Sequence, residues 1–175
     1  MSTETGAATL LDGGAIIRVM LQAALDTIVA LPDITTSAGL LWPLSRQPDV
    51  NLVRICKEDE GVSICAALAL CRKRSALLMQ QTGLFDSLNA VRGIAVEYKL
   101  PVCMFVGLLG KEPGVPPSQN KKYSVRTVLP VLDAMEVPTL SIEENSDIAK
   151  ILEAVDRAYA ESRPLVVLFG RRVKP

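Results

Sequence analysis

The chain of 175 residues contains no histidine. This absence excludes Ser-His-Asp triads, histidine-ligated zinc and the side chain that most often moves protons near neutral pH. Any chemistry that the chain serves must therefore use carboxylates, lysines, backbone groups or a borrowed cofactor.

Aromatic residues and net charge are also scarce. Phe, Trp and Tyr make up 4% of the chain, and 19 basic residues balance 19 acidic ones, so the formal net charge is zero. A neutral chain with few aromatic rings offers little to a phosphate backbone or to stacked bases. We therefore do not expect nucleic-acid binding.

The four cysteines show no CxxC spacing, and each lies in an apolar run (Cys56, Cys65, Cys71 and Cys103). This pattern is typical of small buried hydrophobes rather than of a redox or metal site, and free thiols favour a reducing compartment. No apolar run approaches the ~20 residues of a membrane span, and MSTETGAATLLDGG lacks the basic and apolar regions of a signal peptide. The sequence predicts a cytoplasmic protein without a metal site of its own.

What the chain has is a regular alternation of short apolar runs and longer amphipathic stretches, with 49% hydrophobic residues overall. Its length predicts one domain over residues 1–175, with residues 1–10 as a loose N-terminal tail. Apolar runs separated by helical patterns indicate a doubly wound α/β fold with a mostly parallel sheet of about six strands and helices on both faces. We expect strands at 27–31, 51–55, 75–80, 101–107, 138–142 and 165–169, and helices at 12–26, 36–44, 58–72, 85–99, 125–135 and 147–161.

Ligands of such sheets bind at the carboxyl ends of the strands. The acidic triplet 58–60 follows the second expected strand. First-turn acids ordinarily complement the helix dipole, and spacing alone favours that interpretation. However, a nearly all-apolar helix follows, so an acid at its mouth is a candidate for partial desolvation, which raises a pKa and suits proton transfer.

Two more segments follow strands. The turn 80–87 contains Gly83, where backbone can approach a ligand, although a plain βα turn explains it equally well. The long loop 108–122 is typical of a functional segment, a solvated lid or a partner contact. It is not a Walker A loop, because Glu112 follows Gly110-Lys111, and no GxGxxG motif follows any strand.

The order of segments resembles the pyrimidine-binding (Pyr) domain of thiamine-diphosphate enzymes. It is most similar to the α-subunit family of sulfopyruvate decarboxylase, with phosphonopyruvate decarboxylase as a near relative. The resemblance covers about residues 25–170 and rests on an ordered set of motifs: LPD at 31–33, EDEGVSICAA at 58–67, MQQTGLFDSLNAV at 79–91, YKLPVCMFVGLLGKEPG at 98–114, and the final PLVVLF.

The resemblance implies a role for one acid. In that family a Pyr-domain glutamate donates a hydrogen bond to N1′ of the aminopyrimidine of thiamine diphosphate, which promotes ylid formation and decarboxylation of a 2-oxo acid. Alignment to the helix that follows places this glutamate at Glu58, with Glu60 as the fallback. The same resemblance implies cofactor contacts from Gln81, Thr82, Gly83 and Asn89.

The chain departs from the family at several positions. Phe85 and Asp86 stand where the family has glycine and asparagine, Ala67 replaces a glycine, and Leu108-Leu109-Gly110 replaces Trp-Arg-Gly. The planar guanidinium of an arginine is the natural partner of a sulfonate or phosphonate, and a lysine of the loop can serve in its place. The expected substrate-side residues are Asp33, Lys111, Lys121 and Lys122; an Asp-turn after Pro32 is the ordinary interpretation of Asp33.

The family holds the diphosphate through Mg²⁺ in a second domain with a Gly-Asp-Gly motif. The only Asp-Gly here is Asp12-Gly13, which no strand precedes. The resemblance therefore implies a β subunit whose diphosphate-binding (PP) domain supplies Mg²⁺, and a chain that is inactive alone. Two alternatives stay open: a non-catalytic Pyr-like scaffold or regulatory subunit, and a subunit of a thiamine-dependent C–C carboligase.

Overall fold

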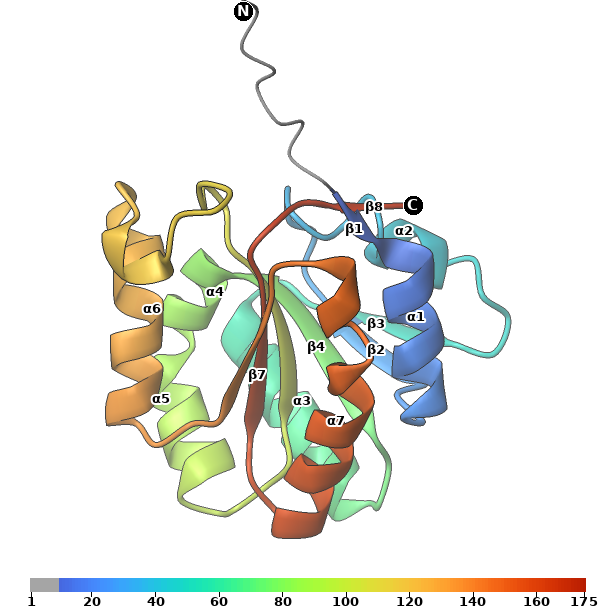
Figure 1. Ribbon diagram of the computed structural model, residues 1–175. Helices are drawn as coiled ribbons and strands as arrows, with labels where there is room; N and C mark the ends of the chain where they lie inside the picture. Colours follow the sequence, from blue (N-terminus) through green and yellow to red (C-terminus); the bar gives the residue numbers. More distant parts are fainter. Residues whose placement is uncertain (1–9) are drawn as a thin grey trace, which may run out of the picture.

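A six-stranded, fully parallel sheet forms the centre of the computed structural model, which describes residues 10–175 (Figure 1). Its order is β3-β2-β4-β5-β7-β6. The strands are β2 (Thr27–Ala30), β3 (Asn51–Arg54), β4 (Ser75–Gln80), β5 (Cys103–Gly107), β6 (Thr139–Ile142) and β7 (Leu165–Phe169). The doubly wound α/β fold and the expected number of strands in this sheet are confirmed.

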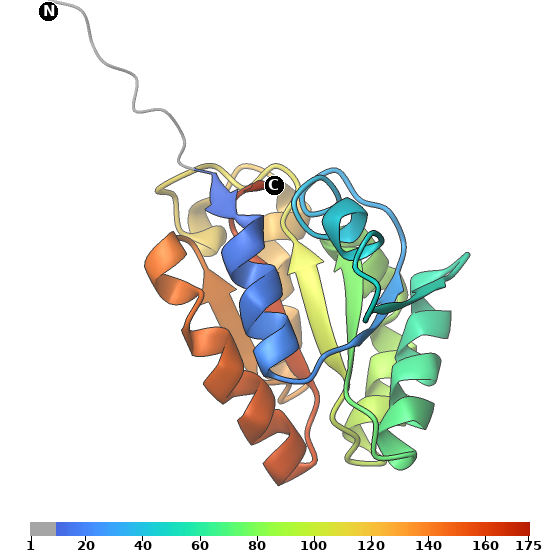
Figure 2. The same cartoon turned by 90° about the vertical axis from the view of Figure 1, so that its right-hand side faces the viewer.

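Helices cover both faces of the sheet (Figures 1 and 2). On one face lie α1 (Gly13–Gln22), α2 (Leu41–Leu44) and α7 (Lys150–Glu161), and on the other lie α3 (Glu58–Leu70), α4 (Gln81–Asp86), α5 (Leu88–Ala90), the π-helical segment η1 (Val91–Val96) and α6 (Tyr123–Ala134). Two short 3₁₀ segments, η2 (Pro117–Gln119) and η3 (Asn145–Asp147), lie in the loops before α6 and α7. Each face therefore has its own hydrophobic cluster.

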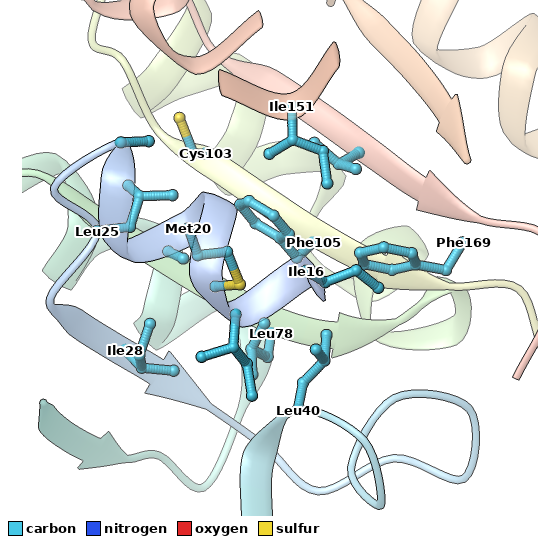
Figure 3. Packing of buried hydrophobic residues seen from close by; sticks show 14 of the residues in the cluster. Ile16, Met20, Leu25, Ile28, Leu40, Leu78, Cys103, Phe105, Ile151 and Phe169 are labelled. Atoms are coloured by element: carbon cyan, nitrogen blue, oxygen red, sulfur yellow. The ribbon is translucent and has the colours of Figure 1, made fainter. Parts of the chain in front are cut away.

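The core on the α1 face centres on two phenylalanines at the middle of the sheet (Figure 3). The rings of Phe105 and Phe169 have centroids 6.1 Å apart, and both residues are fully buried. Ile16 and Met20 of α1 pack over the same region, as Figure 3 shows. Because each buried side chain of this size contributes roughly 1.5–3 kcal/mol, this layer fixes α1 firmly on the sheet.

A second, two-stranded parallel sheet joins β1 (Leu11–Asp12) to β8 (Val173–Lys174). Two glycines make room for it. A Cβ on Gly13 would lie 2.5 Å from the Lys174 carbonyl oxygen, and a Cβ on Gly39 would lie 2.5 Å from Cγ1 of Val173. The sequence did not predict this sheet. The expected tail at 1–10 lies outside the described residues except for Leu10.

Three predicted boundaries need correction. The helix expected from 85 begins at Gln81, directly after β4, and breaks into α4, α5 and η1 before residue 97. The helix expected over 36–44 is mostly turn and becomes helical only at Leu41–Leu44. The last helix forms from Lys150 and follows η3, because Asp147 belongs to η3 and its carboxylate accepts the N–H of Glu144, the N-cap residue of η3. Within residues 10–175, no helix is long and apolar enough to cross a membrane.

Candidate functional site

Glu58 and Gly83 are in direct contact at the carboxyl end of the sheet. Glu58 is the first residue of α3, after β3, and Gly83 lies in the first turn of α4, after β4. A Cβ on Gly83 would lie only 2.1 Å from Oε1 and 2.3 Å from Cδ of Glu58. The partly buried Glu58 side chain therefore occupies the space that a larger residue 83 would need.

The other two acids of the triplet have ordinary roles. Glu60 is exposed, and its carboxylate accepts a hydrogen bond from the Cys56 N–H at 3.1 Å. Asp59 accepts from the Glu60 N–H at 3.0 Å and lies 3.6 Å from Nζ of Lys57. The ordinary interpretation of first-turn acids, which complement the helix dipole and accept free N–H groups, therefore applies to Glu60 and Asp59. Glu58 is the member of the triplet that packs toward α4.

A salt bridge also joins the start of α3 to the end of α4. Nζ of Lys57 lies 3.1 Å from Asp86, at the end of α4. The hydrogen bond with Asp86, followed by the charge of Asp59, raises the pKa of Lys57 above its usual value. Asp86 is thus bound to the start of α3. Phe85 is half-buried and packs against the hydrophobic cluster on the α3 face.

Gln81 is fully buried, and its side chain clamps the loop after β5. Oε1 accepts the Leu109 N–H at 2.8 Å, and Nε2 donates to the Leu109 carbonyl at 2.9 Å and to Oγ of Ser124 at 3.4 Å. Both ends of the amide are therefore used within the chain. Sequence reasoning placed Gln81 near the cofactor but missed this clamp, because its partner lies 28 positions away.

The two other expected cofactor contacts from this segment lie at its surface. Thr82 is exposed, and its hydroxyl accepts from Nε2 of Gln80 at 2.9 Å. Asn89, on α5, is exposed and accepts from Arg92 at 3.0 Å. Thr82 adjoins the Glu58–Gly83 contact in sequence, whereas Asn89 lies six residues beyond Gly83. Their cofactor roles stay predictions.

Asp33 builds the turn after β2. Its carboxylate accepts from the backbone N–H groups of Thr35 and Thr36, at 2.5 and 2.7 Å, and from the Thr36 hydroxyl. The Asp33 N–H donates to Oγ of Ser37 at 2.7 Å. The Asp-turn interpretation therefore accounts for this residue, because the carboxylate is used in local hydrogen bonds. The turn still lies at the same edge of the sheet as Glu58.

The three expected substrate-side lysines differ in their surroundings. The Lys111 side chain is 2% exposed, and its Nζ lies 3.1 Å from Glu143, which packs against Gly170. Nζ of Lys121 is 3.5 Å from Glu112 on an exposed side chain. Lys122 lies over Gly110, where a Cβ would be 2.7 Å from its Cδ.

Glu143 is a residue that the sequence analysis missed. It neutralises Lys111 from the loop after β6, 32 positions away, and removes that lysine from the set available to an anion. Nothing local in the sequence pairs these two residues. They meet because β5 and β6 both flank β7, so the loops at their carboxyl ends converge.

Comparison with solved structures supports the class of fold. The chain is similar to a 2-oxoglutarate:ferredoxin oxidoreductase from Magnetococcus marinus, solved with 2-oxoglutarate, coenzyme A and succinyl-CoA bound. The TM-score is 0.70 at 15% identity, over 93% of this chain and 29% of the oxidoreductase chain. The chain thus has the α/β fold of one part of a much longer enzyme.

Among curated proteins, the chain is similar to sulfopyruvate decarboxylases. The chain is 25% identical over 162 residues to the sulfopyruvate decarboxylase subunit alpha of Methanococcus maripaludis, covering 88% of this chain and 91% of the relative. It is 25% identical to the subunit alpha of Methanocaldococcus jannaschii, over 89% and 90%. The sulfopyruvate decarboxylase of Methanosarcina acetivorans is 27% identical over 90% of this chain but only 40% of its own length.

These relatives confirm the resemblance drawn from the sequence, which is to the α subunit of sulfopyruvate decarboxylase, a carboxy-lyase. No family model matches the chain. Two of these relatives are named as subunits, as the expectation of a partner chain requires.

Proposed function

We propose that the chain is the α (Pyr) subunit of a heteromeric, thiamine-diphosphate-dependent 2-oxo acid decarboxylase, similar to sulfopyruvate decarboxylase. The observation that carries the proposal is the contact of Glu58 with Gly83 at the carboxyl end of the parallel sheet. It gives one acid of the triplet a fixed position beside a backbone segment that bears no side chain. The named relatives point to the same activity.

Glu58 has the features that the proposed role requires. The side chain is partly buried, and no ion pair with a lysine or arginine of residues 10–175 neutralises it. A carboxyl group held this way is placed to form a hydrogen bond with a ring nitrogen of a bound cofactor. Bound thiamine diphosphate would supply the electron sink for loss of carbon dioxide. Glu58 would hold the proton at N1′, and Gly83, which has no side chain, leaves room for the Glu58 carboxylate.

We assign the aminopyrimidine half of the cofactor to this chain, beside the carboxylate of Glu58 where it lies against Gly83. We assign the Mg²⁺ and diphosphate half to the PP domain of a β subunit. The only Asp-Gly of the sequence supports this assignment, since the Asp12 carboxylate caps α1 by accepting the Ala15 N–H at 2.9 Å. That carboxylate is therefore used in the fold.

Substitution of Glu58 by Gln tests the catalytic assignment in the complex with the β subunit. Glu58→Gln keeps the shape but removes the acid, and we expect turnover to fall by about 10²-fold or more, the usual contribution of a positioned acid. Glu60→Gln is the matched comparison, because Gln can still accept the Cys56 N–H. Equal losses in the two variants, or full activity of Glu58→Gln, would contradict the role of Glu58.

Calorimetry separates this proposal from the scaffold alternative, which the bulky Phe85 favours. Thiamine diphosphate with Mg²⁺ is titrated into the chain alone and then into the complex. Heat of binding in the complex, absent from a Glu58→Gln complex or reduced in it, supports the decarboxylase or a carboligase. No binding in either state favours the scaffold, and carbon dioxide release from a 2-oxo acid then separates decarboxylase from carboligase.

A further inference from the structure

A cavity of about 410 Å³ lies at the amino ends of β2, β3 and β4. Its lining includes Asp26 and Thr27 where β2 begins, Asn51 at the start of β3, and the basic run 72–74 between α3 and β4. We call it the amino-end cavity. Cavities that bind small molecules usually have volumes of about 300–1,000 Å³, so its size suits a small ligand.

The lining of the amino-end cavity has an excess of positive charge. Arg72, Lys73 and Arg74 contribute three cations, whereas Asp26 contributes the one carboxylate of the described lining. Four other cavities among residues 10–175 differ, because their basic residues are matched or outnumbered by acidic ones or are paired with carboxylates. Three like charges in consecutive positions repel one another, so the amino-end cavity favours an anionic ligand.

Arg74 is held in place by contacts within the fold. Its guanidinium donates to the Ala23 carbonyl at 3.0 Å, pairs with Asp156 and lies 4.7 Å from the centre of the Tyr159 ring. These contacts fix the guanidinium between the end of α1 and the helix α7. Arg74 therefore forms a rigid part of the cavity wall, and Asp156 offsets its charge.

Arg72 and Lys73 have no such partner. Both side chains are exposed, and neither forms an ion pair with a carboxylate of residues 10–175. The Asp26 carboxylate accepts a hydrogen bond from the Thr27 hydroxyl at 3.1 Å and pairs with neither cation. The charges of Arg72 and Lys73 are therefore available to a ligand that enters the cavity.

The chemistry of these side chains specifies the kind of anion. A guanidinium is a planar fork that binds two oxygens of one group, and an ammonium is a point charge with three rotatable donors. The side chain of Asn51 adds a neutral amide, which is exposed and makes no hydrogen bond within the described part of the chain. Such a set of donors suits the several oxygens of a phosphate or diphosphate better than the two oxygens of a carboxylate.

We propose that the amino-end cavity binds the phosphate or diphosphate group of a small molecule through Arg72 and Lys73. This site is separate from the one around Glu58. Glu58 and Gly83 lie beyond the carboxyl ends of β3 and β4, and the six residues of β4 alone span about 17 Å. A ligand of the amino-end cavity does not touch the candidate catalytic acid, so the inference does not depend on the proposed function.

Calorimetry with inorganic pyrophosphate tests the site in the full chain. Pyrophosphate is titrated at low ionic strength into wild type and into Arg72→Met/Lys73→Met, which lacks both available charges. We expect the affinity to fall at least about tenfold in this variant, because charge-assisted hydrogen bonds to the anion are lost. Since both cations are exposed, binding to wild type should also weaken when KCl is raised to about 0.15 M.

Arg18→Met/Arg46→Met is the matched control. Both arginines are exposed, form no ion pair within residues 10–175 and lie outside the cavity lining, so this variant loses the same charge elsewhere. It should bind pyrophosphate as wild type does. Equal affinity of wild type and Arg72→Met/Lys73→Met, equal losses in the two variants, or no binding to wild type would overturn the proposal.

Amide chemical shifts of the isotopically labelled wild-type chain locate the bound anion without any variant. On addition of pyrophosphate we expect shifts to change at residues 24–27, 51 and 72–74. Changes confined to other residues, such as 58–60 and 81–83, would place the anion elsewhere and contradict the proposal. The measurement uses neither a 2-oxo acid nor thiamine diphosphate, so its outcome is distinct from success or failure of the proposed function.

Discussion

Replacement of Gly83 by alanine is the most direct test of how Glu58 is positioned. The new Cβ would lie 2.1 Å from Oε1, 2.3 Å from Cδ and 2.4 Å from Cγ of Glu58. Non-bonded heavy atoms prefer a separation of about 3.5 Å, so the carboxylate must move by about 1 Å or more. The three nearest atoms all belong to the flexible side chain of Glu58, which can therefore rotate away while the backbone stays.

Stability and activity should therefore change independently in Gly83→Ala. Alanine in a helix is favoured over glycine by roughly 0.5–1 kcal/mol, so we expect thermal unfolding at the wild-type temperature or above. A catalytic group misplaced by about 1 Å can cost about 10²-fold in rate. We expect kcat of the complex to fall by about that factor.

Gly93→Ala is the control for this experiment. Gly93 lies in η1, and a Cβ there would meet no atom within 4 Å. This variant should be at least as stable as wild type, for the same reason as Gly83→Ala, and should keep its turnover. The reasoning would be refuted if Gly83→Ala kept turnover within about twofold of wild type, since the clash would then not concern the acid that matters.

Three further predictions concern the hydrogen bonds of Gln81 and the four cysteines. Gln81→Leu removes both partners of Leu109 and leaves its backbone groups without hydrogen bonds, so the free energy of unfolding in urea should fall by about 2 kcal/mol or more; an unchanged midpoint would contradict the clamp. Burial raises the pKa of Cys65 to about 11 and that of Cys103 to about 12, whereas Cys56 and Cys71 are exposed. A thiol reagent at pH 8 should therefore modify only the two exposed cysteines in the native protein, and all four after unfolding. These folded pKa values exceed the unfolded value of 9.0, so the buried thiols contribute fully to stability below pH 9. That contribution is lost as the pH rises through 11 and 12. Urea unfolding at several pH values would measure the loss of stability.

The central strands could be predicted from the sequence because their signal is local. The boundaries of β4 and β7 match the apolar runs at 75–80 and 165–169, since strands buried on both faces are apolar throughout. The start of α4 was misplaced for the opposite reason. A first turn of Gln81-Thr82-Gly83 has weak helix propensity, and the clamp on Leu109 that holds it depends on a residue far along the chain.

In the candidate site, too, the features with a local signal could be predicted and those that depend on long-range contacts could not. The position of the acidic triplet after β3 could be expected from the pattern, but only packing separates Glu58 from Asp59 and Glu60. No local feature of the sequence distinguishes Lys111, which is buried, from Lys122, which makes no ion pair with a carboxylate of residues 10–175. Long-range pairing with Glu143 makes that distinction.

The small sheet of β1 and β8 has a mechanical consequence. Leu11 pairs with Val173 and Asp12 with Lys174 in parallel register, so a force that pulls on both ends of the described chain loads this sheet in shear. Gly13 and Gly39 both pack against β8 of this small sheet. Its few hydrogen bonds would bear the load before those of the six-stranded sheet do. In a single-molecule pulling experiment the first, low-force event should thus be release of β1 from β8, with the core sheet intact.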